Sequence, residues 1–215
     1  MKKITMIQFL NSYGIRECLQ DTSDNKFMWG DTSDSNKLKL LLTLVKEVFH
    51  DKKVLEFGTY RGKTTYAIAK FLTSGTICTI DCGMEELKIL LEKENREHNN
   101  KIKYSSYDIG ELYKDDLDCV EKIRQVVGNS MRTNVVNTIM SEGPYNLIYI
   151  DASHTYEGIK NDTEISMNCV AKGGLIIWDD YNSHWTGVSR YLNDLSKELD
   201  LIYIEDNRYV LYVKD

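Results

Sequence analysis

Residues 54–62 read VLEFGTYRG, a short apolar run that ends in an acid and is followed by two glycines. An apolar run of this length predicts a buried strand. Gly58 and Gly62 predict a turn in which the backbone comes close to another group. Because KTTYAIAKFL (63–72) then predicts a helix, the turn joins a strand to a helix.

The same alternation of strands and helices continues along the chain. After a helix predicted at 36–50, we expect strands at 52–57, 76–81, 101–108, 145–151 and 174–180, and helices at 63–72, 84–98, 156–171 and 185–199. Two further β-rich runs, joined at Asp206-Asn207, end the chain. The pattern predicts an α/β fold with a doubly wound, mostly parallel, seven-stranded sheet. Because no helix separates the last two strands, we expect a C-terminal antiparallel hairpin at a sheet edge.

We divide the chain into an N-terminal segment, 1–35, and one domain, 36–215. The N-terminal segment is polar and irregular after a short helix, and it is a candidate lid or oligomer contact. Phe27 and Trp29 are its aromatic residues, which either contact a substrate or pack the segment onto the domain. Residues 109–143 are polar, with helical pieces expected around 115–127, and we interpret them as an insertion that caps the substrate.

The composition is that of an ordinary soluble domain, and we expect a cytoplasmic protein. The chain has 215 residues and a net charge of −6, which argues against a nucleic-acid partner. No apolar stretch approaches the roughly 20 residues that span a bilayer, so we expect no membrane partner. The five cysteines are scattered and lack zinc-site spacing, which is typical of buried free thiols.

The glycine turn differs from a dinucleotide fingerprint. That fingerprint is G-x-G-x-x-G, whereas this turn reads E-x-G-x-x-x-G with Glu56 in the place of the first glycine. A carboxylate there repels a pyrophosphate but suits an amine or a cation. Asp81 ends the next strand, where an acid accepts hydrogen bonds from ribose hydroxyls. The ligand that these residues suit has a ribose and a positive group and lacks phosphates, and S-adenosylmethionine has these three features. The alternatives are a purely structural turn and an NAD-dependent enzyme.

The order of elements, with its closing hairpin, resembles the class I S-adenosylmethionine-dependent methyltransferases, which have a Rossmann-like fold. Residues 145–192, YNLIYIDASHTYEGIKNDTEISMNCVAKGGLIIWDDYNSHWTGVSRYL, more closely resemble one branch of that class. This branch contains the small-molecule O-methyltransferases of cephamycin and macrolide-sugar biosynthesis, the methyltransferase 24 type. Its hallmark is a strand ending I-D-x-x-H-x-Y, then a helix, then G-G-x-I-x-x-D-D-Y. The resemblance extends over about 36–215 but is absent at 109–143.

The resemblance implies a role for individual residues of the turn and of the strand ends. The glycine turn would line the methionine part of the cofactor, Tyr60 and Thr64 would lie near its carboxylate, and Asp81 would bind the ribose. Asp108 or Ser106 would approach the adenine. The residues assigned to the cofactor are Glu56, Gly58, Tyr60, Gly62, Thr64, Asp81, Asp108 and Asp151.

Three carboxylates follow two strands that we expect to be neighbours. Asp151 ends one strand, and Asp179 and Asp180 end the next. Placed together they would repel one another, and a divalent cation such as Mg²⁺, which prefers carboxylate oxygens, relieves that repulsion. Capping of the following helices, or exposure to solvent, is the alternative. We assign Asp151, Asp179 and Asp180 to a metal.

His154 lies three residues after Asp151, in an element similar to the D-x-x-K of catechol methyltransferases, in which the lysine takes the proton from the substrate. A histidine can act as a base near neutral pH. His184 and Trp185 should face the same edge of the sheet, Trp185 either at the substrate or in the core. We therefore expect a metal-assisted O-methyltransferase that acts on a hydroxyl of a small metabolite or sugar. The alternative is a non-catalytic S-adenosylmethionine-binding module of a biosynthetic complex. Self-association is a further expectation.

Overall fold

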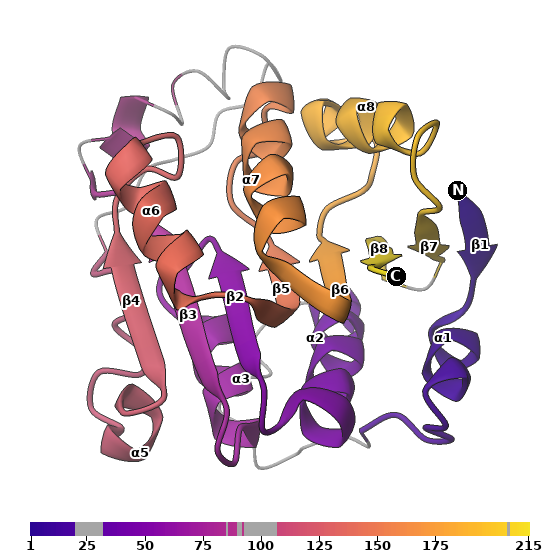
Figure 1. Cartoon of the computed structure of the whole chain (residues 1–215), viewed down its shortest axis with the longest axis horizontal. Coiled ribbons are helices and arrows are strands. Elements are labelled where there is room, and N and C mark those ends of the chain that lie inside the picture. Colours follow the sequence, from indigo (N-terminus) through magenta and orange to yellow (C-terminus); the bar gives the residue numbers. More distant parts are fainter. Residues whose placement is uncertain (20–31, 85, 90–91, 93–106, 206) are drawn as a thin grey trace.

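The computed structural model describes residues 1–19, 32–84, 86–89, 92, 107–205 and 207–215. These residues form a sheet of eight strands in the order β1-β7-β8-β6-β5-β2-β3-β4 (Figure 1). The strands are β1 Lys2–Ile4, β2 Lys53–Phe57, β3 Thr76–Asp81, β4 Ile123–Val127, β5 Tyr145–Ile150, β6 Val170–Trp178, β7 Ile202–Ile204 and β8 Tyr209–Val213. The described helices are α1 Met6–Ser12, α2 Thr32–Leu44 with its π-helical continuation η1 Val45–Phe49, α3 Lys63–Phe71, α5 Leu117–Val120, α6 Thr133–Glu142, α7 Tyr156–Cys169 and α8 Thr186–Leu195.

The pairing of the strands confirms a doubly wound, mostly parallel sheet with a C-terminal antiparallel hairpin. β2 runs parallel to β3 and to β5, and β3–β4 and β5–β6 are parallel pairs as well. β8 is antiparallel to β6 and to β7. The strand order reverses between β5 and β2. A cleft for a ligand is expected beyond the carboxyl ends of the strands at such a point.

Helices cover both faces of the sheet, and the alternation of side chains along the strands explains why. In β5, Leu147 and Tyr149 belong to one buried cluster, whereas Ile148 and Ile150 belong to the other. The first cluster includes residues of α1, α2 and α3, and the second includes residues of α6, α7 and α8. Figure 1 shows α6 and α7 in front of the sheet and α2 and α3 behind it. Both faces of the central strands are therefore covered by helices and shielded from water, as is usual for a parallel sheet.

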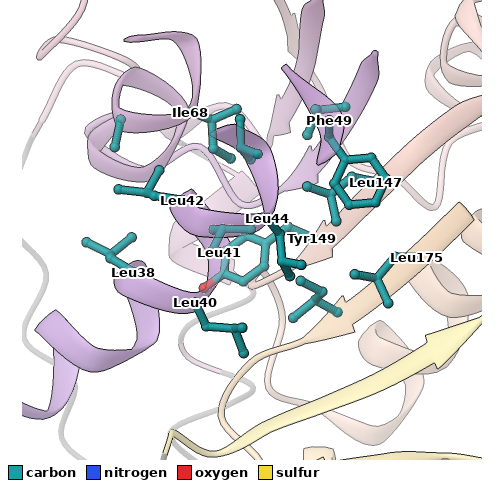
Figure 2. Packing of buried hydrophobic residues seen from close by; sticks show 14 of the residues in the cluster. Leu38, Leu40, Leu41, Leu42, Leu44, Phe49, Ile68, Leu147, Tyr149 and Leu175 are labelled. Carbon is teal, nitrogen blue, oxygen red and sulfur yellow. The ribbon is translucent and has the colours of Figure 1, made fainter. Parts of the chain in front are cut away.

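Helix α2 is buried on more than one side. Its leucines at 38, 41 and 42 are buried, and Leu40 and Leu44 are buried completely. Figure 2 shows these leucines around Tyr149 and Leu147 of β5, with Leu175 of β6 and Ile68 of α3 close by. The second half of α2, residues 38–44, is thus buried on nearly all sides, which is typical of an interior position.

The N-terminus adds an eighth strand that we did not predict. β1 runs parallel to β7 and lies outside the hairpin, so the hairpin is not the edge of the sheet. Thr5 caps α1, because its hydroxyl accepts from the Gln8 backbone N–H at 3.3 Å while the Gln8 side chain accepts from the Thr5 N–H at 2.8 Å. Phe9 and Leu10 are buried in the core. The first part of the segment 1–35 thus belongs to the domain, whereas Phe27 and Trp29 lie outside the described residues.

The stretch interpreted as an insertion, 109–143, contributes strand β4 to the sheet and contains helices α5 and α6. β4 pairs in parallel with β3, from Ile77 opposite Ile123 to Asp81 opposite Val127. Helix α5 falls within the helical pieces expected around 115–127, but the last part of that range, 123–127, is strand β4. Of the strand expected at 101–108, residues 101–106 lie outside the described part of the chain, and 107–108 are not in a strand.

Two element boundaries also differ from the prediction. The helix expected at 156–171 ends at Cys169, and Gly173 and Gly174 after it lie inside β6. The helix expected at 185–199 spans Thr186–Leu195. In the described part of the chain, the structure has no helix that is long and apolar enough to cross a membrane.

Candidate active site

A cavity of about 770 Å³ opens at the carboxyl ends of the parallel strands. Its walls come from the glycine turn after β2, the end of β3, the loops after β4, β5 and β6, and the β7–β8 turn. This volume is within the range of roughly 300–1,000 Å³ that is common for small-molecule sites. The predicted residues that line it are Gly58, Tyr60, Thr64, Asp81, Asp151, His154, Asp179, Asp180 and Trp185.

Contacts within the protein require glycine at both positions of the turn. Gly58 has φ +101°, and a Cβ on it would lie 2.0 Å from the carbonyl oxygen of Asp151. Gly62, the N-cap of α3, has φ +87°, and a Cβ there would lie 2.6 Å from the ring of Tyr113. The backbone N–H of Asp151 also donates to the carbonyl of Phe57 at 2.9 Å. The glycine turn therefore lets the ends of β2 and β5 touch, which forms the floor of the cavity.

Glu56 is fully buried behind the turn and is not part of the cavity wall. Its Oε2 accepts from the hydroxyls of Thr65 and of Thr79, the latter at 2.6 Å, while its Oε1 has no hydrogen-bond partner. Burial raises the pKa of Glu56 to about 7, although both threonine hydrogen bonds act to lower it. Glu56 thus holds the base of α3 against β2 and β3, and it carries a carboxyl group that is easily protonated.

Asp81 closes the side of the cavity next to the glycine turn. Its Oδ2 accepts from the backbone N–H of Tyr60 at 2.5 Å, which ties the turn to the end of β3. Burial raises the pKa of Asp81, and hydrogen bonds from Tyr60 and Cys82 counteract that effect. Tyr60 itself has φ +48° and a half-exposed ring, and it lines the cavity together with Thr64.

Asp151, His154 and Asp180 form a compact group on the opposite side of the cavity. Each offers one possible ligand atom, and these atoms all lie within 4.8 Å of one another. His154 Nε2 lies 3.2 Å from Asp180 Oδ2. Two carboxylates and an imidazole are an arrangement that can hold a cation or move a proton.

Asp179, the third carboxylate that we assigned to a metal, is placed differently. It is buried, and its Oδ2 accepts from the hydroxyl of Tyr149 at 2.7 Å. Its Oδ1 accepts from the backbone N–H of Asp180 at 2.5 Å. Burial, with Asp151 and Asp179 beside it, raises the pKa of Tyr149 well above its ordinary value, so Tyr149 stays a donor. In this structure Asp179 therefore holds the backbone of Asp180, and the third member of the compact group is His154 and not Asp179.

Trp185 stacks on the imidazole of His154. The ring centroids are 3.9 Å apart and the planes differ by 16°. His184 packs edge-on against Trp185 at 4.6 Å and is not among the residues of the cavity wall. Trp185 thus lines the cavity and also packs against the buried cluster of α6, α7 and α8, so the structure combines the two alternatives.

Some predicted residues lie elsewhere, and others were missed. The Asp108 side chain is 82% exposed, with Lys114 Nζ at 3.7 Å, and it is not in the cavity wall. Ser106 lies outside the described residues. The loop after β4, Gly128 to Met131, lines the cavity instead. We missed it because we did not recognise IRQVV as a strand.

Asp162 of α7 also lines the cavity beside that loop. It is buried, and its Oδ1 accepts from the Ser130 hydroxyl at 2.5 Å and from the Asn161 amide at 3.1 Å. Burial raises the pKa of Asp162 to about 6. A buried acid on a helix gives no signal in the sequence, since acids on helices are usually exposed.

Solved structures of O-methyltransferases have the same fold. The Bacillus cereus O-methyltransferase in complex with SAH (S-adenosylhomocysteine) superposes with a TM-score of 0.58 at 14% identity, covering 97% of this chain and 96% of that one. The O-methyltransferase NovP has a TM-score of 0.59 at 17% identity, covering 82% and 78%. The MycE methyltransferase of mycinamycin biosynthesis, in complex with Mg and SAH, has a TM-score of 0.50 at 14% identity, covering 99% of this chain and 55% of its own.

No curated protein sequence matches the chain. A family model does match: residues 55–181 fit a methyltransferase domain, the methyltransferase 24 type. The matched stretch runs from β2 to the loop after β6 and contains the glycine turn, Asp81, and the Asp151–His154–Asp180 group. Because it covers more than half of the chain, the chain belongs to this family and is a methyltransferase.

Proposed function

We propose that the chain transfers a methyl group from S-adenosylmethionine to a hydroxyl of a small metabolite or sugar, assisted by a divalent cation. One observation carries the proposal: the glycine turn with Asp81 and the Asp151–His154–Asp180 group line the same cavity. One part suits a nucleoside and the other suits the activation of an oxygen. The reaction needs both within one enclosure.

The turn side of the cavity fits the cofactor by its chemistry. Asp81 at the end of β3 suits the hydroxyls of a ribose, as acids at that position do in nucleoside sites. Gly58, Tyr60 and Thr64 would surround the methionine part, and Gly62 and the buried Glu56 would support them from behind. The loop 128–131, which lines the cavity, replaces Asp108 in our assignment of the adenine end. The neighbouring structures bound to SAH support this placement.

The opposite side fits a cation. Asp151 and Asp180 offer the carboxylate oxygens that Mg²⁺ prefers. Both oxygens of Asp179 already accept hydrogen bonds, one of them from the backbone N–H of Asp180, and so we propose that Asp179 orients Asp180. When bound, a divalent cation lowers the pKa of a coordinated hydroxyl and orients it. MycE, a structural neighbour, is bound to Mg, which supports the metal part of the proposal.

His154 is our candidate for the base. Its imidazole is held by Asp180 at 3.2 Å and by the stacked ring of Trp185. The hydroxyl of the acceptor gives its proton to an imidazole nitrogen, and the hydroxyl oxygen then attacks the methyl carbon of the sulfonium in line with the departing sulfur. The new C–O bond replaces the S–CH₃ bond, and S-adenosylhomocysteine leaves as a neutral thioether.

The test is the release of S-adenosylhomocysteine from S-adenosylmethionine with a panel of small hydroxylated compounds and sugars. We expect EDTA to abolish turnover and Mg²⁺ to restore it. We expect His154→Gln to lower kcat by about 10²–10⁴-fold, the range for a lost general base, without weakening SAH binding. His50→Gln is the matched control, since His50 contacts Thr73 and does not line the cavity.

Each part of the proposal has its own contrary result. Turnover that persists in EDTA removes the metal. Unchanged kcat in His154→Gln removes His154 as the base. If the turnover of His154→Gln returns at high Mg²⁺, His154 is a metal ligand, a role that its position beside Asp151 and Asp180 allows.

A further inference from the structure

Arg208 occupies an unusual position at the edge of the cavity. It lies in the β7–β8 turn with φ +63°, a left-handed conformation that is unfavourable for a long side chain and common for Gly and Asn. Its carbonyl accepts from the backbone N–H of Tyr181 at 3.2 Å, which fixes the turn against the loop after β6. Strain of this kind is concentrated at functional sites, so the side chain calls for an explanation.

Pairing with the acids of the site does not explain Arg208. Its Nη2 lies 3.7 Å from Asp180 Oδ1, whereas a charge-assisted hydrogen bond is about 2.7–2.9 Å long. The Arg208 side chain is 40% exposed, and an ion pair that is both long and exposed contributes little to stability. No hydrogen bond of the guanidinium to another described residue accompanies it. The guanidinium of Arg208 therefore lies at the cavity with most of its N–H donors available for hydrogen bonds.

The location of this cation is specific. Among the described residues of the cavity wall, the lysines and arginines are Lys63 and Arg208. Lys63 is the first residue of α3, beside the glycine turn. Arg208 is on the other side, where Asp180 lies between it and His154. A substrate group bound by Arg208 would therefore lie close to a substrate group that contacts His154.

We infer that Arg208 binds an anionic group of the acceptor, a carboxylate or a phosphate, so that the substrate is a hydroxylated acid rather than a neutral alcohol or sugar. The inference rests on the proposed function, because it assumes that the acceptor hydroxyl lies at His154. A planar guanidinium matches both anions bidentately, and a fixed fork at the rim would orient the acceptor as well as attract it. Because the net charge is −6, a local cation at the cavity would favour the approach of an anionic substrate.

The test measures binding of benzoate and of inorganic phosphate by calorimetry, in buffer that contains SAH and Mg²⁺, with benzamide as the neutral counterpart of benzoate. We expect wild-type protein to bind one anion or both and not benzamide. Arg208→Asn should weaken that binding at least about tenfold, the loss expected for hydrogen bonds to a charged group. Binding of benzoate alone would indicate a carboxylic acid as the acceptor, and binding of phosphate alone a phosphate ester.

The choice of Asn makes the variant informative, since Asn tolerates the left-handed conformation. Its thermal midpoint should be equal to that of the wild type or higher, which rules out misfolding as the cause of lost binding. Lys63→Gln tests the other cation of the wall and should keep the Arg208-dependent binding. Arg208→Lys should bind more weakly than the wild type, because the charge stays and the fork is lost.

Anion binding that survives in Arg208→Asn, anion binding that is lost in Lys63→Gln instead, or no anion binding by the wild type would each overturn the inference. The SAH titration in the same experiment separates the two proposals. Normal SAH binding without Arg208-dependent anion binding contradicts only the inference. Failure to bind SAH contradicts the proposed function, while the anion titration still reports on Arg208.

Discussion

At the scale of single residues, Glu56 is the group whose environment differs most from what its sequence position suggests. An acid that ends a strand before a glycine turn was expected to face the ligand. It is instead completely buried, with two threonine donors on one oxygen and none on the other. The acid therefore supports the turn from behind, and the sequence could not reveal this because Thr65 and Thr79 lie on separate elements.

This burial makes the stability of the protein depend on pH. The pKa of Glu56 rises from 4.5 to about 7 on folding. Between these values the folded chain binds the proton more tightly than the unfolded chain, so stability falls as pH rises and the loss is complete above about pH 7. Glu56→Gln removes the buried charge. The variant should match the wild type near pH 5 and exceed its free energy of unfolding near pH 8, by an amount on the order of 3 kcal/mol.

Urea unfolding of the protein without cofactor, at the two pH values, measures this difference. Glu121→Gln, an exposed acid outside the cavity, is the control and should show the same difference from wild type at both values. If Glu56→Gln behaves like the control, Glu56 is not a buried carboxyl with a raised pKa.

Other residues of the site were predictable because each follows a strand. Asp81, Asp151 and Asp180 stand at or just after carboxyl ends of parallel strands, and topology alone brings such positions to one edge. Side-chain direction was not predictable. Asp179 and Asp180 are adjacent in the sequence, yet Asp179 accepts hydrogen bonds from the Tyr149 hydroxyl and from a backbone N–H, while Asp180 lies beside His154.

At the scale of elements, the glycine turn depends on contact between β2 and β5. Because a Cβ on Gly58 would lie 2.0 Å from the Asp151 carbonyl oxygen, Gly58→Ala must push the two strand ends apart. We expect a loss of about 2–4 kcal/mol in the free energy of unfolding, and weakened SAH binding.

Gly14→Ala is the matched control for the turn. Gly14 also has a positive φ, +75°, but a Cβ there would meet nothing within 4 Å. The control should lose only about 1–2 kcal/mol, the cost of the left-handed conformation, and keep SAH binding. Equal losses of stability and of SAH binding in the two variants would show that the contact with Asp151 is unimportant. Chemical unfolding and SAH titration of both variants measure the effect.

Most elements were predictable from periodicity, and β4 was the exception. Strands β2, β3, β5 and β6 are runs of buried apolar residues, which are readily recognised. β4, IRQVV, is an edge strand whose residues are exposed or only partly buried. An edge strand with polar residues lacks the alternation on which the prediction depends.

At the scale of the whole molecule, the N-terminus is part of the fold. β1 extends the sheet beside β7, and Phe9 and Leu10 of α1 enter the same core cluster as α2. Their contribution was not visible in the sequence, because a strand of three residues and a helix of seven residues are too short to show a periodic pattern of apolar residues.

We therefore expect Phe9→Ala to destabilise the whole domain. Phe9 is 2% exposed, and its removal leaves a cavity that typically costs about 3–5 kcal/mol. Ile7→Ala, on the same helix but 41% exposed, should change stability by less than about 1 kcal/mol. Urea unfolding of both variants provides the comparison. Two small effects would mean that residues 1–12 are a detachable segment, as a lid would be.

The central claim at this scale is that the cavity beyond β2 and β3 holds a nucleoside with a charged amino-acid tail. Titration of S-adenosylhomocysteine into the purified protein by calorimetry tests it most directly. We predict binding in the micromolar range that is lost in Asp81→Asn and kept in Asp118→Asn, an exposed acid of α5 that is not in the cavity wall. No detectable binding by the wild type, or equal binding by all three proteins, would contradict the account.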